Sequence, residues 1–193
     1  DCLENVVCTV SCVCDEGFYG SKCSKLESNR EQAVAIRKDM LGTLNTVSTL
    51  QDVTSEAVGQ QASTLQALAS DVEELDEESK ALAVTAVLQI TGSLQQTSGS
   101  GLDSSTASQL ADTLNNLMST SDSIAAAIDN LAEAQVTSLF VGEDALEVVT
   151  PNLKISSQKL SLGNMANSSF APPRSEEDIL SGRESPTLSM PSK

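Results

Sequence analysis

The chain has 193 residues and a formal net charge of −16, from 27 acidic and 11 basic residues. This balance argues against nucleic acid or an anionic membrane surface as a partner, because both need a positive field. The sequence contains no histidine, which removes the commonest general base and metal ligand and every histidine-dependent catalytic triad.

All cysteines lie at the start of the chain, at positions 2, 8, 12, 14 and 23. Small secreted modules use disulfides because they bury too little surface to offset chain entropy. A zinc site is an alternative, but a single C-x-C without histidine or a second close pair fits zinc-ligand spacings poorly. A catalytic thiol is another alternative, and it would lack a histidine partner.

The stretch CVCDEGFYGSKC, Cys12 to Cys23, resembles the end of an EGF-like module in its C-x-C-x5-G-x2-C spacing. Residues 17–20, Gly-Phe-Tyr-Gly, fit the glycine-aromatic turn of that family. We therefore interpret residues 1–24 as a partial EGF-like module that serves as a spacer or contact module. Phe18 and Tyr19 are expected to pack within this small module.

The resemblance also implies a disulfide pairing. Cys14 would pair with Cys23 and Cys2 with Cys12, while Cys8 would lack its partner, which would precede Asp1 in a longer protein. The chain begins inside the cysteine cluster, without an initiator methionine or a signal peptide. We therefore expect it to be a piece of a longer protein.

Residues 28–135 predict a bundle of antiparallel helices joined by short connections. Apolar residues recur at three- and four-residue steps over five stretches, 29–51, 55–75, 77–96, 104–118 and 122–135. In the first stretch the side chains expected to be buried are Ala33, Ile36, Met40, Leu44, Val47 and Leu50. An extended coiled coil is the alternative, but breaks near positions 52, 76, 100 and 120 interrupt any sustained heptad pattern.

From residue 136 the pattern changes to that of strands. Residues 146–150 and 153–157 predict two strands around Pro151 and Asn152, with Leu153 and Ile155 facing inward and Lys154 facing outward. Residues 163–193 are rich in Ser, Pro and Asn, which is typical of a long loop or a disordered tail. The expected fold class is mainly α, with a truncated disulfide-rich module first and the start of a β subdomain at 136–162.

The order of these parts resembles the front of a GAIN domain, which precedes the membrane in adhesion G-protein-coupled receptors and polycystin-type proteins. The resemblance covers about residues 30–193 and rests on element order and on the segment VVTPNLKIS, Val148 to Ser156. It implies that 28–135 is the helical subdomain and that a β-sandwich follows. The cleavage motif of that family, His-Leu-Ser/Thr, has no counterpart in this sequence, so autoproteolysis carries over to no residue here.

Three further segments have a structural and a functional interpretation. Asp71 to Lys80 holds six carboxylates and is expected to be a solvated turn that favours the start of the third helix, with a calcium site or a glycosidase pair as alternatives. Residues 98–101, Ser-Gly-Ser-Gly, indicate a flexible linker, with glycosaminoglycan attachment as the alternative. Asn167 begins the only N-glycosylation sequon and is the expected glycosylation site in an extracellular loop, with an unmodified polar surface residue as the alternative.

These observations predict a non-catalytic extracellular segment of a cell-surface receptor or adhesion protein, acting as spacer and membrane-proximal scaffold. We expect no cofactor and no metal, and membrane contact only through segments outside this chain. The expected partners are other domains of the same parent chain and an extracellular protein ligand. The alternative is a secreted or soluble helical protein-interaction module, in which helix faces bind partner helices.

Overall fold

The computed structural model describes residues 13–20, 22–95, 102–118, 123–165, 169–182 and 186–189. The described part is mainly helical, as the sequence predicts. The main helices are α1 (Arg30–Leu50), α2 (Ser55–Ala69), α3 (Glu77–Gln95), α4 (Ser104–Leu117) and α5 (Ser123–Ser138). The strands before and after them are β1 (Phe18–Tyr19), β2 (Lys25–Leu26), β3 (Leu146–Val149) and β4 (Lys154–Ser157).

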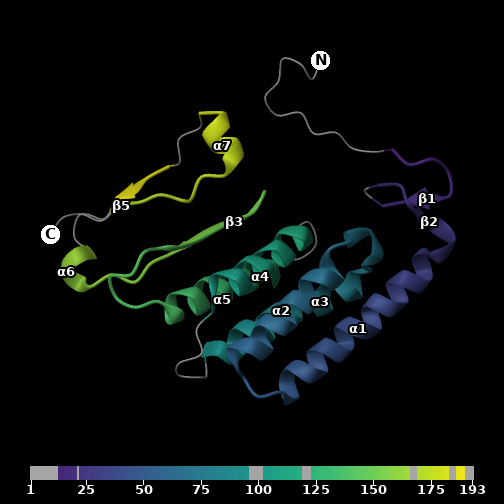
Figure 1. Cartoon of the computed structure of the whole chain (residues 1–193), viewed down its shortest axis with the longest axis horizontal. Helices are drawn as coiled ribbons and strands as arrows, with labels where there is room; N and C mark the ends of the chain where they lie inside the picture. Colours follow the sequence, from purple (N-terminus) through teal and green to yellow (C-terminus); the bar gives the residue numbers. More distant parts are fainter. Residues whose placement is uncertain are drawn as a thin grey trace.

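Figure 1 shows these helices lying side by side, with α1 at one edge and the β3–β4 hairpin on the other side of the bundle. The most extensive contacts join alternate helices, α1 with α3, α2 with α4 and α3 with α5. Two smaller parts attach to this bundle. The β1–β2 pair lies at the start of α1, and the hairpin lies against α4 and α5.

Side-chain caps explain where several helices begin. The hydroxyl of Thr54 accepts a hydrogen bond from the backbone N–H of Ala57 at the start of α2. The carboxylates of Asp76 and Asp103 likewise each accept a hydrogen bond from the backbone N–H of the residue three positions later, at the starts of α3 and α4. Each cap satisfies a backbone donor that has no partner within its helix, so the breaks between these helices are encoded locally in the sequence.

The core consists of leucine, isoleucine, valine and alanine. The largest fully buried apolar side chains come from all five main helices, α1 to α5. Several alanines between them are fully buried as well. Small alanine side chains let helices pack closely at the density of a protein interior, which is how a chain with only four aromatic residues builds a core. The buried side chains include Leu41, Leu65, Ile90, Leu110, Leu114, Leu117 and Leu131, with Ala62, Ala69, Ala83, Ala86, Ala107 and Ala111.

The buried face predicted for the first helix is wrong. Of the expected stripe, Leu44 alone is buried, whereas Ile36, Met40, Val47 and Leu50 are exposed. The helix instead packs on α3 with a face that includes Leu41 and Asn45. The Asn45 amide donates to the carbonyl of Leu82 on α3. The apolar pattern located the helix correctly but could not tell which of two apolar faces meets the bundle.

The hairpin agrees closely with its prediction. Strands β3 and β4 are antiparallel, and Val148 lies opposite Ile155. Val148, Leu153 and Ile155 are buried in the same core as the helices. Lys154 lies on the face of β4 opposite Ile155, as predicted, and its ammonium group there is ion-paired with Asp178.

Two polar side chains of the helices fix the hairpin in place. On α4, the Asn115 side-chain oxygen accepts from the Thr150 hydroxyl at 3.1 Å and from the Asn152 backbone N–H at 2.9 Å. On α5, the buried Gln135 accepts from the Ser157 hydroxyl at 2.8 Å. These three bonds join segments that the sequence places far apart, so they orient the hairpin on the bundle.

The expectation of a loop or a disordered tail over 163–193 is only partly correct. The described residues there contain short elements, α6 (Leu162–Met165), β5 (Ser169–Phe170), α7 (Glu176–Leu180) and β6 (Leu188–Ser189), and β5 pairs with β6. The N-terminus of α7 is capped by reciprocal hydrogen bonds between Ser175 and Asp178. Asp178 also pairs with Lys154 of the hairpin, which tethers a polar segment that composition alone suggests is unstructured.

We predict that replacing Asn115 by alanine loosens the hairpin. Asn115→Ala removes one acceptor shared by two donors and is expected to lower the free energy of unfolding by about 1–2 kcal/mol. Hydrogen exchange at the Asn152 amide should accelerate strongly. The matched control is Asn116→Ala, because Asn116 makes one long contact of 3.4 Å to the Ala69 carbonyl instead. Equal exchange at Asn152 in both variants would contradict this role for Asn115.

Candidate functional site

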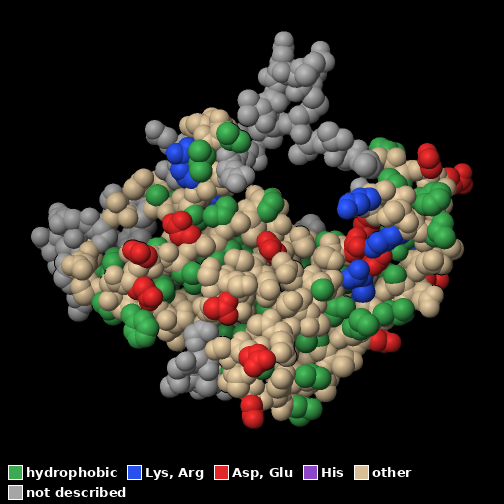
Figure 2. Space-filling model, viewed as in Figure 1, with side chains coloured by type: hydrophobic (Ala, Val, Ile, Leu, Met, Phe, Trp, Pro, Cys, Tyr) green, Lys and Arg blue, Asp and Glu red, His purple; other side chains and the backbone are tan. Residues whose placement is uncertain are grey.

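Polar chemistry in the described residues concentrates where the cysteine loop meets the helices. Figure 2 shows Lys and Arg side chains gathered around Asp and Glu side chains at the right of the molecule, where Figure 1 places β1, β2 and the start of α1. The acidic side chains come from the segment between α2 and α3, which includes a 3-10 turn at Val72–Glu74. The basic side chains come from β2 and α1. We call this cluster the junction.

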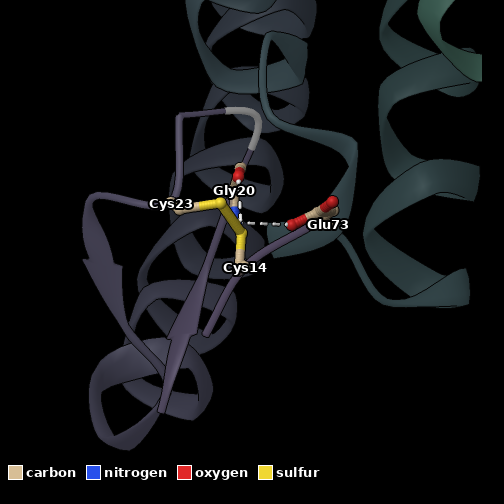
Figure 3. The surroundings of a disulfide bond; sticks show 4 residues. All are labelled: Cys14, Gly20, Cys23 and Glu73. Atoms are coloured by element: carbon tan, nitrogen blue, oxygen red, sulfur yellow. Dashed lines mark hydrogen bonds between the residues drawn. A yellow bond between two sulfur atoms is a disulfide. The ribbon is translucent and has the colours of Figure 1, made fainter. Parts of the chain in front are cut away.

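The cysteine loop is closed by a disulfide between Cys14 and Cys23, the pair that the EGF-like resemblance implied for this loop. Strand β1 lies within the loop and pairs antiparallel with β2, which follows Cys23, so that Tyr19 lies opposite Lys25. Gly20 has a φ of +91°, which a residue with a side chain rarely adopts, and the turn there brings the chain back toward Cys23. The Gly20 backbone N–H donates to the Glu73 carboxylate at 2.9 Å, beside the disulfide (Figure 3).

Glu74 is the centre of the junction, with only 4% of its surface exposed. One carboxylate oxygen accepts from the Tyr19 hydroxyl at 2.8 Å and from the Lys25 ammonium at 2.6 Å. The other oxygen accepts from Arg37 Nε at 2.6 Å. A buried carboxylate is stable only when it is paired and hydrogen-bonded, and here three separate segments supply those partners.

Arg37 connects the junction to the end of α2. Besides Glu74, its guanidinium donates to the backbone carbonyls of Ala67 and Leu68. These carbonyls lie in the last turn of α2, where acceptors lack partners within the helix and a cation is favourable. This helps to explain why α2 ends at Ala69, whereas the sequence suggests a helix to position 75. Asp71, just after the helix, pairs with Lys25 and Arg37.

Tyr19 lies between cations as well as against Glu74. Its ring centroid is 5.5 Å from the Arg30 guanidinium carbon and 5.8 Å from the Lys25 nitrogen, both within the range of a cation–π contact. Arg30 also donates to the Glu73 carbonyl. Tyr19 is 6% exposed, and the expectation that it packs within the small module misses its contacts with Glu74 and Arg30 of the helical part. It is the side chain that enters the helical part.

The hydrogen bonds set the ionisation of the junction. Burial raises the pKa of Glu74, but hydrogen bonds from Lys25, Tyr19 and Arg37 outweigh it and lower that pKa from 4.5 to about 2. The hydrogen bond to Glu74, with burial adding to it, raises the pKa of Tyr19 above 10.0. Hydrogen bonds to Asp71 and Glu74 likewise raise the pKa of Lys25. The charged forms of Glu74 and Lys25 and the neutral form of Tyr19 are therefore all favoured together.

The junction corrects the expectation that residues 71–80 form a solvated turn. Its second part does behave so, because Asp76 caps α3 and Glu78 is exposed and paired with Lys38. Its first part supplies the acidic side of the junction, in which Glu74 is buried, Asp71 is partly exposed and Glu73 is exposed. The sequence held one signal of this contact, because five of the 11 basic residues lie within positions 22–38. In an acidic chain, such a cluster of cations is expected to lie near the densest group of acids.

A second polar region is a cleft of about 520 Å³ between α2 and α4. Its lining includes Gln66, Asp112, Asn115 and Asn116. Gln66 donates to Asp112 at 2.9 Å, and Asn115 is bonded to the hairpin. These polar groups hydrogen-bond to each other or to neighbouring backbone. Their main role is therefore to hold the two helices and the hairpin together.

Comparison with protein-family models, with curated proteins and with solved structures found no match for this chain. Within the described ranges, no helix combines the length and the apolar character needed to cross a membrane. The same ranges contain no group of three or more acidic or cysteine side chains placed to hold a metal ion. Cys2, Cys8, Cys12, Asn167 and the 98–101 linker lie outside the described residues.

Tyr19 provides a direct test of the junction, because it is the only tyrosine in the chain. We predict that ultraviolet titration of the full chain gives a tyrosine pKa above 10.0. Glu74→Gln should move it back toward that value, since a neutral amide no longer disfavours the tyrosinate. An unshifted tyrosine in the unmodified chain would show that Tyr19 does not contact Glu74.

Glu74 should also make stability depend on acid. Its pKa is lower in the folded chain than its ordinary value, so its contribution is complete above pH 4.5 and is lost as the pH falls toward about 2. Glu74→Gln is expected to cost about 3 kcal/mol near neutral pH, because it leaves buried cations without their partner.

The measurement is denaturant unfolding of both chains between neutral and acidic pH. Their stabilities should converge as the pH falls. Glu78→Gln is the control, because it breaks an exposed ion pair and should change stability by less than about 1 kcal/mol. A Glu74→Gln chain as stable as the Glu78→Gln chain at neutral pH would contradict the prediction.

Proposed function

We propose that this chain is a non-catalytic segment of the extracellular part of a cell-surface receptor or adhesion protein. In this role the junction is a rigid joint that fixes the end of an EGF-like module on a membrane-proximal helical scaffold. The observation that carries the proposal is the contact of Glu74 with Tyr19, Lys25 and Arg37. It connects the cysteine loop to two different parts of the bundle by buried bonds.

A rigid joint differs physically from a spacer attached by a linker. The last residues of the loop lead directly into α1 through a 3-10 turn at Glu27–Asn29, so no flexible stretch separates them. The hydrogen bond from the Gly20 backbone N–H to the Glu73 carboxylate adds a second contact between the loop and the bundle. A force or a rotation applied to the module would therefore be transmitted to the bundle.

The disulfide supports the extracellular setting. Disulfides persist in oxidising compartments and are rare in the cytosol, and the Cys14–Cys23 bridge closes the loop that presents Tyr19 and Gly20. The hairpin supports the scaffold role, because Asn115 and Gln135 hold it on the helices. This arrangement suits a helical subdomain that carries the start of a β subdomain, as the GAIN-type resemblance implies.

The proposed partners are the other domains of the same parent chain and an extracellular protein ligand. The runner-up is a secreted or soluble helical protein-interaction module. One observation favours it, the exposed apolar face of α1, since an amphipathic helix can bind a partner helix through such a face. The two proposals share the extracellular disulfide and differ in whether the chain acts within a larger protein or by itself.

The test is to express the full chain through the secretory pathway of eukaryotic cells and alkylate it without reduction. We expect Cys14 and Cys23 to be protected from alkylation and to be recovered in one linked peptide. The double variant Cys14→Ser and Cys23→Ser should keep the helical circular dichroism signal. Its Gly20 amide should exchange faster, because the open loop no longer holds that amide against Glu73.

Two outcomes would count against the proposal. Alkylation of Cys14 and Cys23 in the native secreted chain would remove the extracellular argument. Unchanged protection of the Gly20 amide in the double variant would show that the disulfide does not support the joint. A control with Cys8→Ser separates effects of the odd cysteine from those of the loop.

A further inference from the structure

An exposed apolar turn connects α5 to β3. Its side chains Phe140 and Val141 are 78% and 60% exposed. Phe18 is 44% exposed and Tyr19 is 6% exposed, so Phe140 exposes the larger part of its ring in a chain that has only four aromatic residues. Figure 2 shows hydrophobic and acidic side chains next to each other at the lower left, where Figure 1 places this connection. Single exposed apolar residues are common, but two large adjacent ones make this turn a candidate contact surface.

Three hydrogen bonds hold the turn in one conformation. The Phe140 backbone N–H donates to the Glu143 carboxylate at 2.8 Å, and the Glu143 backbone N–H donates to the Phe140 carbonyl at 3.2 Å. The Gly142 N–H donates to the Lys159 carbonyl at 2.9 Å, which ties the turn to the segment after β4. Gly142 has a φ of +87°, a conformation that favours glycine. The turn therefore presents Phe140 and Val141 in a preorganised form, which loses less conformational freedom on binding.

The carboxylates next to the turn carry charge that no cation pairs with. Residues 81–153 contain eight acidic residues and no basic residue, so this stretch carries half of the net charge of −16. Glu143, Asp144 and Glu147 follow the tip of the turn and are exposed. None of the ion pairs in the described part of the chain involves these three carboxylates. They therefore differ from the paired carboxylates of the junction and can receive cations from a partner.

The combination of an apolar tip and unpaired carboxylates specifies the chemistry of a partner. Lys159 brings one positive charge near the turn through its bond to Gly142, and the three carboxylates still leave the charge negative. Such a surface repels nucleic acid and anionic lipid. It matches an apolar pocket with Lys or Arg side chains at its mouth, because an apolar centre with a charged, complementary rim is the usual anatomy of a protein interface.

We propose that Phe140 and Val141 dock into an apolar pocket of a partner protein whose Lys or Arg side chains lie against Glu143 and Asp144. The Phe140 ring is the anchor, because a few large side chains at the centre of an interface carry most of its binding energy. The carboxylates mainly speed association with a cationic surface. This inference gives the protein partner a definite chemistry. It requires neither the disulfide nor the junction, so its tests and those of the proposed function fail independently.

The first test uses β-cyclodextrin, whose apolar cavity accepts a phenyl ring, in its neutral form and in a form with ammonium groups around the rim. Binding to the full chain is followed by NMR at the Phe140 ring. We expect the ammonium form to bind at least about tenfold more tightly at low ionic strength, and salt should reduce this ratio by screening. Phe140→Ser should abolish binding, whereas the control Phe18→Ser should not. Equal affinities of the two forms, or binding that survives Phe140→Ser, would overturn the proposal.

A second measurement tests whether the occupant is a protein. The full chain is used to select binders from a displayed library of a small cysteine-free domain with one randomised face. We expect the selected faces to combine apolar residues with an excess of Lys and Arg, and to lose at least about tenfold affinity for Phe140→Ser. The matched control is Leu50→Ser, since Leu50 is 81% exposed on α1, and it should bind as before. Binders insensitive to Phe140→Ser would contradict the proposal. Sedimentation with phosphatidylcholine vesicles that is lost in Phe140→Ser would assign the turn to a lipid surface instead.

Discussion

One buried carboxylate determines how the cysteine loop is placed on the helical bundle. Glu74 lies at the end of a 3-10 turn and is almost fully excluded from water, so its charge has to be offset by protein groups. The compensating donors come from β1, β2 and α1. Because one carboxylate needs all three, the cysteine loop, the first helix and the segment after α2 have to assemble together.

The rest of the molecule is assembled by different means. The helical core is built from aliphatic side chains with many alanines, and the hairpin is fixed to it by Asn115 and Gln135. Apolar burial is non-directional, so it holds the helices together without specifying the position of the loop or the hairpin. The hydrogen bonds at the two ends supply that direction, and they leave one apolar face of α1 without a neighbour in the described residues.

The order of the elements and the starts of the helices were largely predictable, although α2 ends at Ala69 and not at position 75. The starts of α2, α3 and α4 follow from Thr54, Asp76 and Asp103, and the Pro151–Asn152 turn marks the hairpin. The junction was not predictable, because periodicity describes one segment at a time. The bond between Tyr19 and Glu74 joins residues 55 positions apart, and no spacing rule links them. The clustering of cations at 22–38 was the one available hint.

The sequence by itself determined local properties, since caps, turns and apolar periods act within a few residues: the helices, the hairpin and the acidic charge of the chain. The closing of the cysteine loop at Cys14 and Cys23 followed from its resemblance to a known module. Only the tertiary structure decided which face of α1 is buried, where Tyr19 lies and which of the clustered carboxylates leaves water. These outcomes depend on competition between distant partners for the same space. Leu41 and Asn45 pack on α3 while Arg37 reaches Glu74, and this combination fixes the rotation of the helix.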